Sequence, residues 1–154
     1  MKRTTRSTTL VALFCVVVAA TIAPAARADG HACSNRSVAG TYGYTTTGTR
    51  LGIGPVAGVG IFTLDRNGNV LSGKQTVSFN GVIADETYTG TYTVNSDCTG
   101  TGTLVVVSSI PAFNRTSNLD LVWVDNSSAL RAIFTNAGTI ITVDAKKMFP
   151  EQEQ

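Results

Sequence analysis

Between residues 40 and 147 the chain repeats short segments rich in Thr, Val, Ile and Tyr, each ending at a break that carries Gly, Asn, Asp or Ser. Residues 87–94 are the clearest example, because Thr occupies every odd position and the even positions include Tyr88 and Tyr92. An alternation with a period of two is typical of a β-strand with one wet face and one buried face. None of the segments has a helical period, so the pattern predicts an all-β domain.

Eight strands are expected, joined mostly by short turns. They cover residues 41–47, 58–65, 70–79, 87–94, 99–108, 117–124, 129–135 and 139–145. Because sequential strands pair most often with their neighbours, we expect an eight-stranded antiparallel up-and-down β-barrel, which leaves no exposed edge. A β-sandwich is the alternative. Asn67-Gly68 predicts a type I′ hairpin turn, and Gly73 predicts a bulge or bend in the third strand.

Three gaps between the expected strands look longer than a turn: residues 48–57, 81–86 and 109–116. The first is rich in Gly and Pro and predicts a flexible lid at one mouth of the barrel. The third contains Pro111 and Phe113 and predicts an apolar loop that folds over a mouth.

The N-terminus has the layout of a secretory signal peptide. Three basic residues precede an apolar run at 10–20, which is too short for a comfortable membrane span, and Ala26-Arg27-Ala28 offers a small-residue cleavage site. An uncleaved N-terminal anchor is the alternative. We expect the mature chain to be secreted or periplasmic and not embedded in a membrane. The expected organisation is a signal peptide at 1–28, a lead-in at 29–39, a β-barrel domain at 40–147 and a flexible tail at 148–154.

Removing the signal peptide reverses the net charge. The full chain has 12 Lys and Arg against 10 Asp and Glu, a net charge of +2. Four of the basic residues lie in the first 28, so the remainder carries a net charge of −2. No basic patch is left to neutralise a run of phosphates, which argues against nucleic-acid binding. A Gly-rich phosphate loop leading into a helix is also absent from the sequence, and we expect no cofactor.

The mature chain keeps two cysteines, Cys33 and Cys98. An exported protein meets an oxidising compartment, so a disulfide is the expected pairing. It would tie the N-terminal lead-in to a hairpin tip. Two free thiols are the alternative. A metal site formed by the two cysteines is disfavoured, because the mature chain has no other cysteine and a single histidine to complete it.

Two stretches resemble known proteins. The first runs from Cys33-Ser34-Asn35 to the GTYGY of residues 40–44, and the second is the YTGTYTVNSDCTGT of residues 88–101. They resemble a group of small secreted bacterial proteins, mostly uncharacterised. The chain is also similar to the wider barrel class that includes allene oxide cyclase-like, dirigent-like and, more loosely, lipocalin-like proteins. The resemblance implies a barrel fold but no activity, because no catalytic residue of the cyclase class has a matching motif here.

Catalytic residue types are scarce, which favours a protein that is not an enzyme. His31 is the single histidine, and no Gly-x-Ser-x-Gly elbow accompanies it, so a hydrolase triad is not expected. After cleavage, Asp29-Gly30-His31 would form an N-terminus that can hold Cu(II) or Ni(II) in a square plane of nitrogen ligands. A coincidental histidine in an irregular lead-in is the alternative. Residues 65–69, DRNGN, lack the further ligands of a calcium loop and predict a plain hairpin.

Charged residues in or beside the expected strands are candidates for a ligand site: Asp120 and Arg131 lie inside strands, and Glu86 and Lys74 flank the middle hairpin. Each points either into the lumen, where a charge needs a partner and can orient a ligand, or to solvent on the outer wall. A cross-strand pair between Asp120 and Arg131 is feasible in some registers.

Aromatic residues add Tyr88, Tyr92 and Trp123 as candidate ligand contacts, with simple filling of the barrel as the alternative. An eight-stranded barrel has an interior that side chains just fill, or that holds one small ligand. The sequence therefore supports three functions: binding of a small apolar or amphipathic ligand, a structural or surface-interaction role with a filled core, and cyclase- or isomerase-type catalysis.

Overall fold

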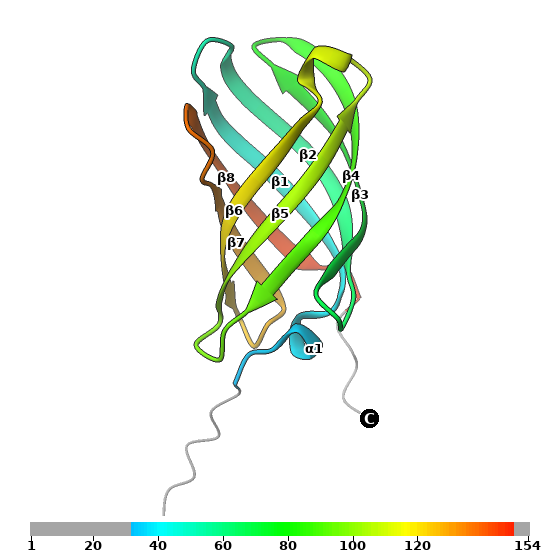
Figure 1. The fold of residues 1–154 in the computed structure, drawn as a ribbon, viewed down its shortest axis with the longest axis vertical. Coiled ribbons are helices and arrows are strands. Elements are labelled where there is room, and N and C mark those ends of the chain that lie inside the picture. The colour runs from blue at the N-terminus through cyan, green and yellow to red at the C-terminus, as the bar shows by residue number, and fades with distance from the viewer. Residues whose placement is uncertain (1–31, 150–154) are drawn as a thin grey trace, which may run out of the picture. The chain divides into compact units, whose positions relative to one another are not determined.

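The computed structural model describes residues 32–149, which form a closed eight-stranded barrel with a one-turn helix at one end (Figure 1). The elements are α1 (Asn35–Val38), β1 (Gly40–Arg50), β2 (Gly54–Leu64), β3 (Asn69–Phe79), β4 (Val82–Val94), β5 (Thr99–Ser108), η1 (Pro111–Phe113), β6 (Arg115–Val124), β7 (Ala129–Phe134) and β8 (Thr139–Lys147). Each strand pairs antiparallel with the next, and β8 pairs back onto β1. The predicted up-and-down barrel is confirmed, and the sandwich is excluded because the sheet closes on itself.

Several predictions lie outside the described residues. These are the signal peptide at 1–28, the copper or nickel site at Asp29, Gly30 and His31, and the tail beyond Phe149. Within residues 32–149, no helix is long and apolar enough to cross a membrane.

The alternation along each strand sends one set of side chains into the barrel. In β4, Glu86, Tyr88 and Tyr92 are buried, whereas the Thr residues at the odd positions are exposed. The two faces predicted for residues 87–94 are therefore confirmed. Threonine suits the outer wall because its β-branched side chain packs on a pleated surface while its hydroxyl remains exposed to solvent. Some of these hydroxyls also pair across strands, as in Thr93 and Thr101, whose Oγ1 atoms lie 3.0 Å apart.

The turns are tighter than predicted because the strands are longer. β1 and β2 extend into the Gly- and Pro-rich segment and leave the short turn 51–53 where a flexible lid was expected. β4 begins at Val82, so the expected gap at 81–86 is almost entirely strand. The third gap is a true loop, in which residues 109–114 contain the helix η1.

The type I′ turn occurs at a different hairpin from the one predicted. Asn80 and Gly81 join β3 to β4 with φ values of 50° and 90°, the left-handed pair that this turn requires. At Asn67-Gly68 only Gly68 is left-handed, with φ of 92°. The Asp65 carboxylate closes that loop by accepting hydrogen bonds from the backbone amides of Asn67 and Asn69, and the loop joins β2 to β3 as the predicted hairpin.

The end of the barrel that carries α1 is closed. A capping box between Ser34 and Ser37 begins the helix, and Val38 is fully buried beneath it. The Tyr42 hydroxyl donates a hydrogen bond to the Val38 carbonyl oxygen at 2.7 Å, and the Tyr42 ring stacks on Phe62 with centroids 5.1 Å apart. From residue 33 onward the predicted lead-in is therefore an ordered plug.

Cys33 and Cys98 lie at disulfide distance, as predicted, with their Cα atoms 4.9 Å apart. The bond joins the plug to the β4–β5 turn and closes a loop with a sequence separation of 65. Because a cross-link of this length removes entropy from the unfolded chain, replacing both cysteines by Ala is expected to lower the free energy of unfolding by about 4 kcal/mol. Urea unfolding measures this loss. A double variant within about 1 kcal/mol of the wild type would contradict the assigned role of the bond.

Candidate functional site

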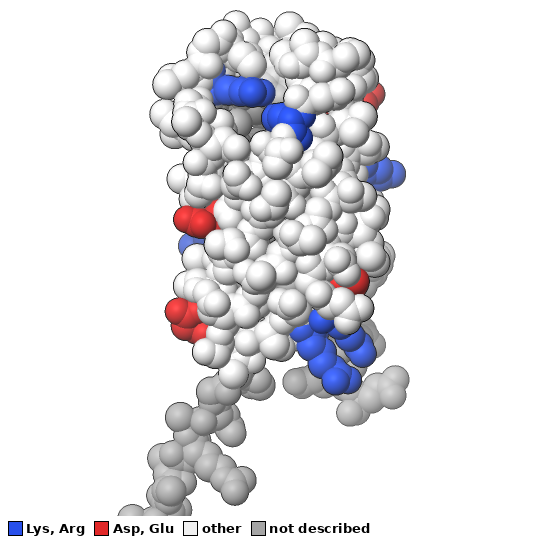
Figure 2. All heavy atoms as spheres, viewed as in Figure 1, with Lys and Arg blue, Asp and Glu red and all other residues white. Residues whose placement is uncertain are grey.

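The barrel encloses a cavity of about 350 Å³, lined by inward side chains from all eight strands. At the end opposite α1 the lining includes Arg50, Asn136, Ala137 and Thr139, at the tips of β1 and β8 and in the β7–β8 turn. Figure 2 shows a hollow at this end of the barrel. β7 contributes just six residues, so the wall is low on this side. The volume lies within the usual range of ligand pockets, about 300–1,000 Å³.

The free space follows from small inward residues on β5, β6 and β7. Gly102, Ser117 and Ala132 line the cavity where larger side chains would fill it. A Cβ built on Gly102 would meet its nearest neighbour, the Leu121 side chain, at 3.5 Å, so the site has room for one. The rest of the lining is mostly aliphatic and aromatic and includes Phe62, Leu64, Val70, Leu104, Leu119, Leu121, Trp123, Leu130 and Val143.

A buried ion pair borders the cavity. Arg115, at the start of β6, donates two hydrogen bonds to the Glu86 carboxylate on β4, at 2.6 and 2.8 Å. The Glu86 side chain is completely buried, whereas the Arg115 side chain is 18% exposed. Arg115 also donates to the Phe113 carbonyl oxygen and lies over the Phe79 ring, 5.6 Å from its centroid. The β5–β6 loop is thus fixed to the barrel by the same guanidinium.

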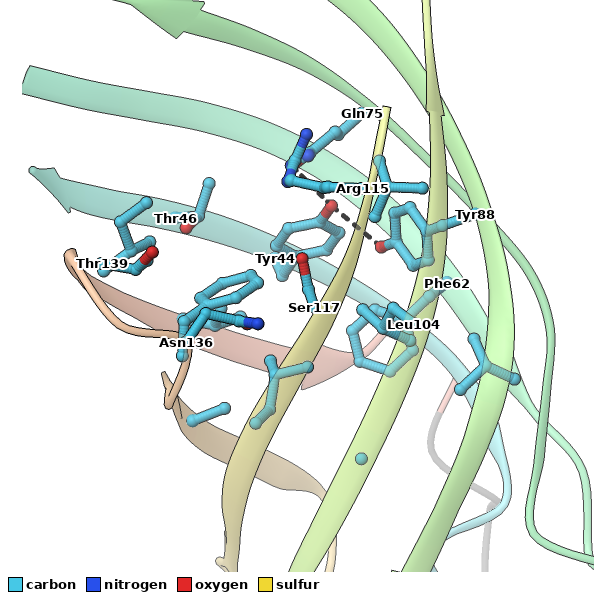
Figure 3. Close-up of a pocket in the computed structure, with 18 of the residues that line it drawn as sticks. Tyr44, Thr46, Phe62, Gln75, Tyr88, Leu104, Arg115, Ser117, Asn136 and Thr139 are labelled. Atoms are coloured by element: carbon cyan, nitrogen blue, oxygen red, sulfur yellow. Dashed lines mark hydrogen bonds between the residues drawn. The ribbon is translucent and has the colours of Figure 1, made fainter. Parts of the chain in front are cut away.

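A chain of hydrogen bonds leads from this ion pair into the cavity, and Figure 3 shows the part that includes Tyr44 and Tyr88. The Gln75 amide donates to Glu86 at 2.6 Å, and its oxygen accepts from the Tyr44 hydroxyl at 2.8 Å. Tyr44 in turn accepts from the Tyr88 hydroxyl at 2.9 Å. Because a carboxylate can only accept, every donor in the chain points toward Glu86. The Tyr88 oxygen ends the chain with a lone pair left over on the cavity side.

Burial raises the pKa of both Tyr44 and Tyr88 above the ordinary tyrosine value. For Tyr88 the neighbouring Tyr44 adds to the rise, while for Tyr44 the hydrogen bond from Tyr88 opposes it. Both rings therefore stay neutral and act as hydrogen-bonding groups rather than as bases. The Tyr88 ring occupies its position because residue 73 is glycine: a Cβ there would overlap the ring. The bulge predicted at Gly73 is present, as a register shift between Val70 and Gly73.

Ser117 offers a second polar group inside the barrel. It is 2% exposed and lines the cavity, and Figure 3 shows it among the lining side chains. Within residues 32–149 the hydroxyl has no hydrogen-bond partner, unlike that of Thr46, which donates to the Thr142 carbonyl oxygen at 3.0 Å. Its hydrogen-bonding capacity is available to a molecule in the cavity.

The structure separates the predicted site residues into two groups. Tyr88, Tyr92 and Trp123 line the cavity, and Glu86 lies behind Gln75 and Arg115. Tyr92 and Trp123 lie near the closed end, where the Tyr92 hydroxyl is 3.1 Å from the Asn35 carbonyl oxygen.

Asp120 and Arg131, with Lys74, lie on the outer wall, which corrects the lumen placement considered for them. Inward positions are odd-numbered in β6 and even-numbered in β7, so both side chains point to solvent. Asp120 lies opposite Ile133 rather than Arg131, and Arg131 pairs with Asp144 across 3.7 Å. Among the described residues, no group of three or more His, Cys, Asp or Glu is arranged to hold a metal ion.

Several polar residues of the cavity were not predicted as site residues. None of Arg50, Gln75, Ser117 and Tyr44 is among the site residues predicted from the sequence. Arg115 was placed in the loop before the sixth strand. Side chains alternate along a strand, and Arg115 is an even number of residues from Leu119 and Trp123. That spacing is the signal that could have placed Arg115 inside the barrel.

No protein-family model, no curated protein and no solved structure matches this chain. The resemblance to small secreted bacterial proteins and to cyclase-like and dirigent-like barrels therefore stays a prediction from the sequence. The chemistry of the cavity follows from its own residues.

The ion pair supports a prediction about stability. Glu86→Gln keeps the size of the side chain but leaves the Arg115 guanidinium without a counter-ion, which is expected to cost about 3 kcal/mol. Asp144→Asn is the matched control, because Asp144 is 71% exposed in its pair with Arg131 and should lose less than about 1 kcal/mol. Urea unfolding compares the two variants. Equal losses would show that the buried pair contributes no more than an exposed one.

A second prediction concerns alkaline pH. The four tyrosines of the chain, Tyr42, Tyr44, Tyr88 and Tyr92, all point inward, and burial raises the pKa of each above its ordinary 10.0, to about 12 for Tyr92. The unfolded chain releases these protons near pH 10 while the folded protein keeps them. Stability is therefore fully retained below pH 10 and falls as the pH rises from 10 toward 12. Ultraviolet absorbance should show phenolate only as circular dichroism shows unfolding, and phenolate in a folded protein near pH 10 would contradict this.

Proposed function

We propose that this protein binds one small, largely apolar molecule inside its barrel, in an extracytoplasmic compartment. The observation that carries the proposal is the cavity of about 350 Å³ with an apolar floor and polar groups near its open end. One water molecule takes about 30 Å³ of the liquid, so such a space suits a ligand of roughly a dozen atoms of similar size. The disulfide and the predicted signal peptide support the compartment.

The arrangement of the site supports binding over the alternatives. A structural protein with a filled core would not need Gly102, Ser117 and Ala132 at inward positions around a void, because voids lose packing contacts. A cyclase or isomerase needs a group that can take or give a proton. Both oxygens of Glu86 already accept hydrogen bonds from Arg115 or Gln75. Tyr44 and Tyr88 are held neutral, so the polar groups orient a ligand more readily than they transform it.

Trp123 provides a direct readout, because it is the single tryptophan of the chain and lines the cavity. Titration with decanol, an uncharged probe of suitable size, is expected to change the Trp123 fluorescence and to saturate at one molecule per protein. Isothermal calorimetry gives the same stoichiometry independently. Absence of saturable binding in both measurements would overturn the proposal in favour of a structural role.

A filling variant locates the binding site. Gly102→Leu places four extra carbon atoms in the cavity from a position with room for a Cβ, and it should weaken decanol binding at least tenfold, about 1.4 kcal/mol. Thr103→Leu is the matched control, because the neighbouring residue of β5 points to solvent. Circular dichroism and urea unfolding confirm that both variants are folded. If Gly102→Leu binds decanol as tightly as Thr103→Leu, the probe does not occupy the barrel.

A further inference from the structure

The charges around the cavity are unbalanced. Its lining contains two cationic residues, Arg50 and Arg115, and no Asp or Glu. Glu86 behind the wall neutralises Arg115 through two short hydrogen bonds. Arg50 has no such neighbour: within residues 32–149 its guanidinium takes part in no ion pair and no side-chain hydrogen bond. One uncompensated positive charge is left at the open end.

The position of Arg50 directs this charge at the cavity. Arg50 is the last residue of β1, opposite Gly54 of β2 and Thr139 of β8, and it is half-buried and lines the cavity. Figure 2 shows basic side chains beside the hollow at this end.

Acidic residues lie elsewhere in the barrel. Asp65, Asp97 and Asp125 sit in turns at the end that carries α1. Asp85 is exposed on β4, where its carboxylate accepts a hydrogen bond from Thr76 at 2.8 Å. No described carboxylate is thus placed to neutralise Arg50.

We propose that the ligand is a small amphipathic anion, with its negatively charged head bound by Arg50 at the mouth and its apolar tail in the barrel below. This inference rests on the proposed binding function and adds the chemical class of the ligand. A guanidinium suits this role because its planar fork binds a carboxylate with two hydrogen bonds and is more weakly hydrated than an ammonium group. An uncharged ligand would leave Arg50 unused, and a cation would be repelled by it.

The part of the cavity beneath Arg50 defines the chemistry of the ligand's tail. The walls below the Tyr44–Tyr88 level are formed by residues such as Phe62, Leu104 and Leu119, and the floor is reached at Trp123. No charged residue lines this deeper part. A straight aliphatic chain or a compact ring fits this environment, and a second charged group on the ligand would be buried without a partner.

The test compares two probes that share one tail. Decanoate carries a negative head and decanol a neutral one, and both report through Trp123 fluorescence. The wild-type protein is expected to bind decanoate about tenfold more tightly than decanol. Arg50→Gln should abolish that preference by weakening decanoate binding, and Arg50→Lys should retain part of it. Added salt should weaken decanoate binding and spare decanol.

The control variant removes the same charge far from the mouth. Arg66 is exposed in the β2–β3 turn at the end that carries α1. Arg66→Gln should therefore leave the affinities for decanoate and decanol unchanged. If the wild type binds decanol as tightly as decanoate, or if Arg50→Gln keeps the preference, the inference is wrong and the binding function stands. If neither probe binds saturably, the binding function fails and the inference fails with it.

Discussion

The width of an eight-stranded barrel is nearly fixed by the number of strands, and every inward side chain competes for that width. Closure of β8 onto β1 imposes this limit here. At the end that carries α1 the limit is met by large residues: Tyr42 stacks on Phe62, and Tyr92 lies against Trp123 with centroids 6.1 Å apart. Where β5, β6 and β7 present Gly102, Ser117 and Ala132 instead, the same width leaves a cavity. The distribution of residue sizes thus decides where the barrel is solid.

Placing a charge inside so narrow a barrel requires a complete set of partners. Glu86 is fully buried, and its two oxygens accept from Arg115 and Gln75, so no lone carboxylate oxygen faces the apolar interior. The partners are constrained in turn. Gln75 is oriented by accepting from Tyr44, and Tyr88 reaches Tyr44 because Gly73 leaves space for its ring. Such a polar network defines one arrangement of the cavity wall. A wall that is already ordered avoids the entropy cost of ordering its side chains when a ligand binds.

The sequence was sufficient to predict the barrel because period-two alternation and the spacing of breaks are local properties. The strand ends were less predictable, because Gly54 and Pro55 are typical loop residues, yet pairing with β1 extends β2 through both of them. The polar site was harder still. Glu86 and Arg115 are 29 residues apart, on strands β4 and β6 that are not neighbours in the sheet, so their contact exists only once the barrel has curved. Asp120 and Arg131 were candidates because they are charged residues within strands. Leu119, Leu121 and Trp123 point into the barrel, however, so the alternation along β6 places Asp120 on the outer wall.

The two ends of the barrel also differ in how their polar groups are satisfied, and this difference bears on function. At the closed end the hydroxyl of Tyr42 is satisfied by the backbone carbonyls of Val38 and Ser127, and that of Tyr92 by those of Asn35 and Asp65. At the open end the Arg50 guanidinium and the Ser117 hydroxyl have no partner among the described residues. Buried polar groups left without partners cost stability, and among the described residues the Trp123 Nε1 atom on the cavity floor is a buried exception near the closed end. Arg50 and Ser117 both line the same cavity, so the ligand proposed above would supply the partners that the protein itself does not provide at this end of the barrel.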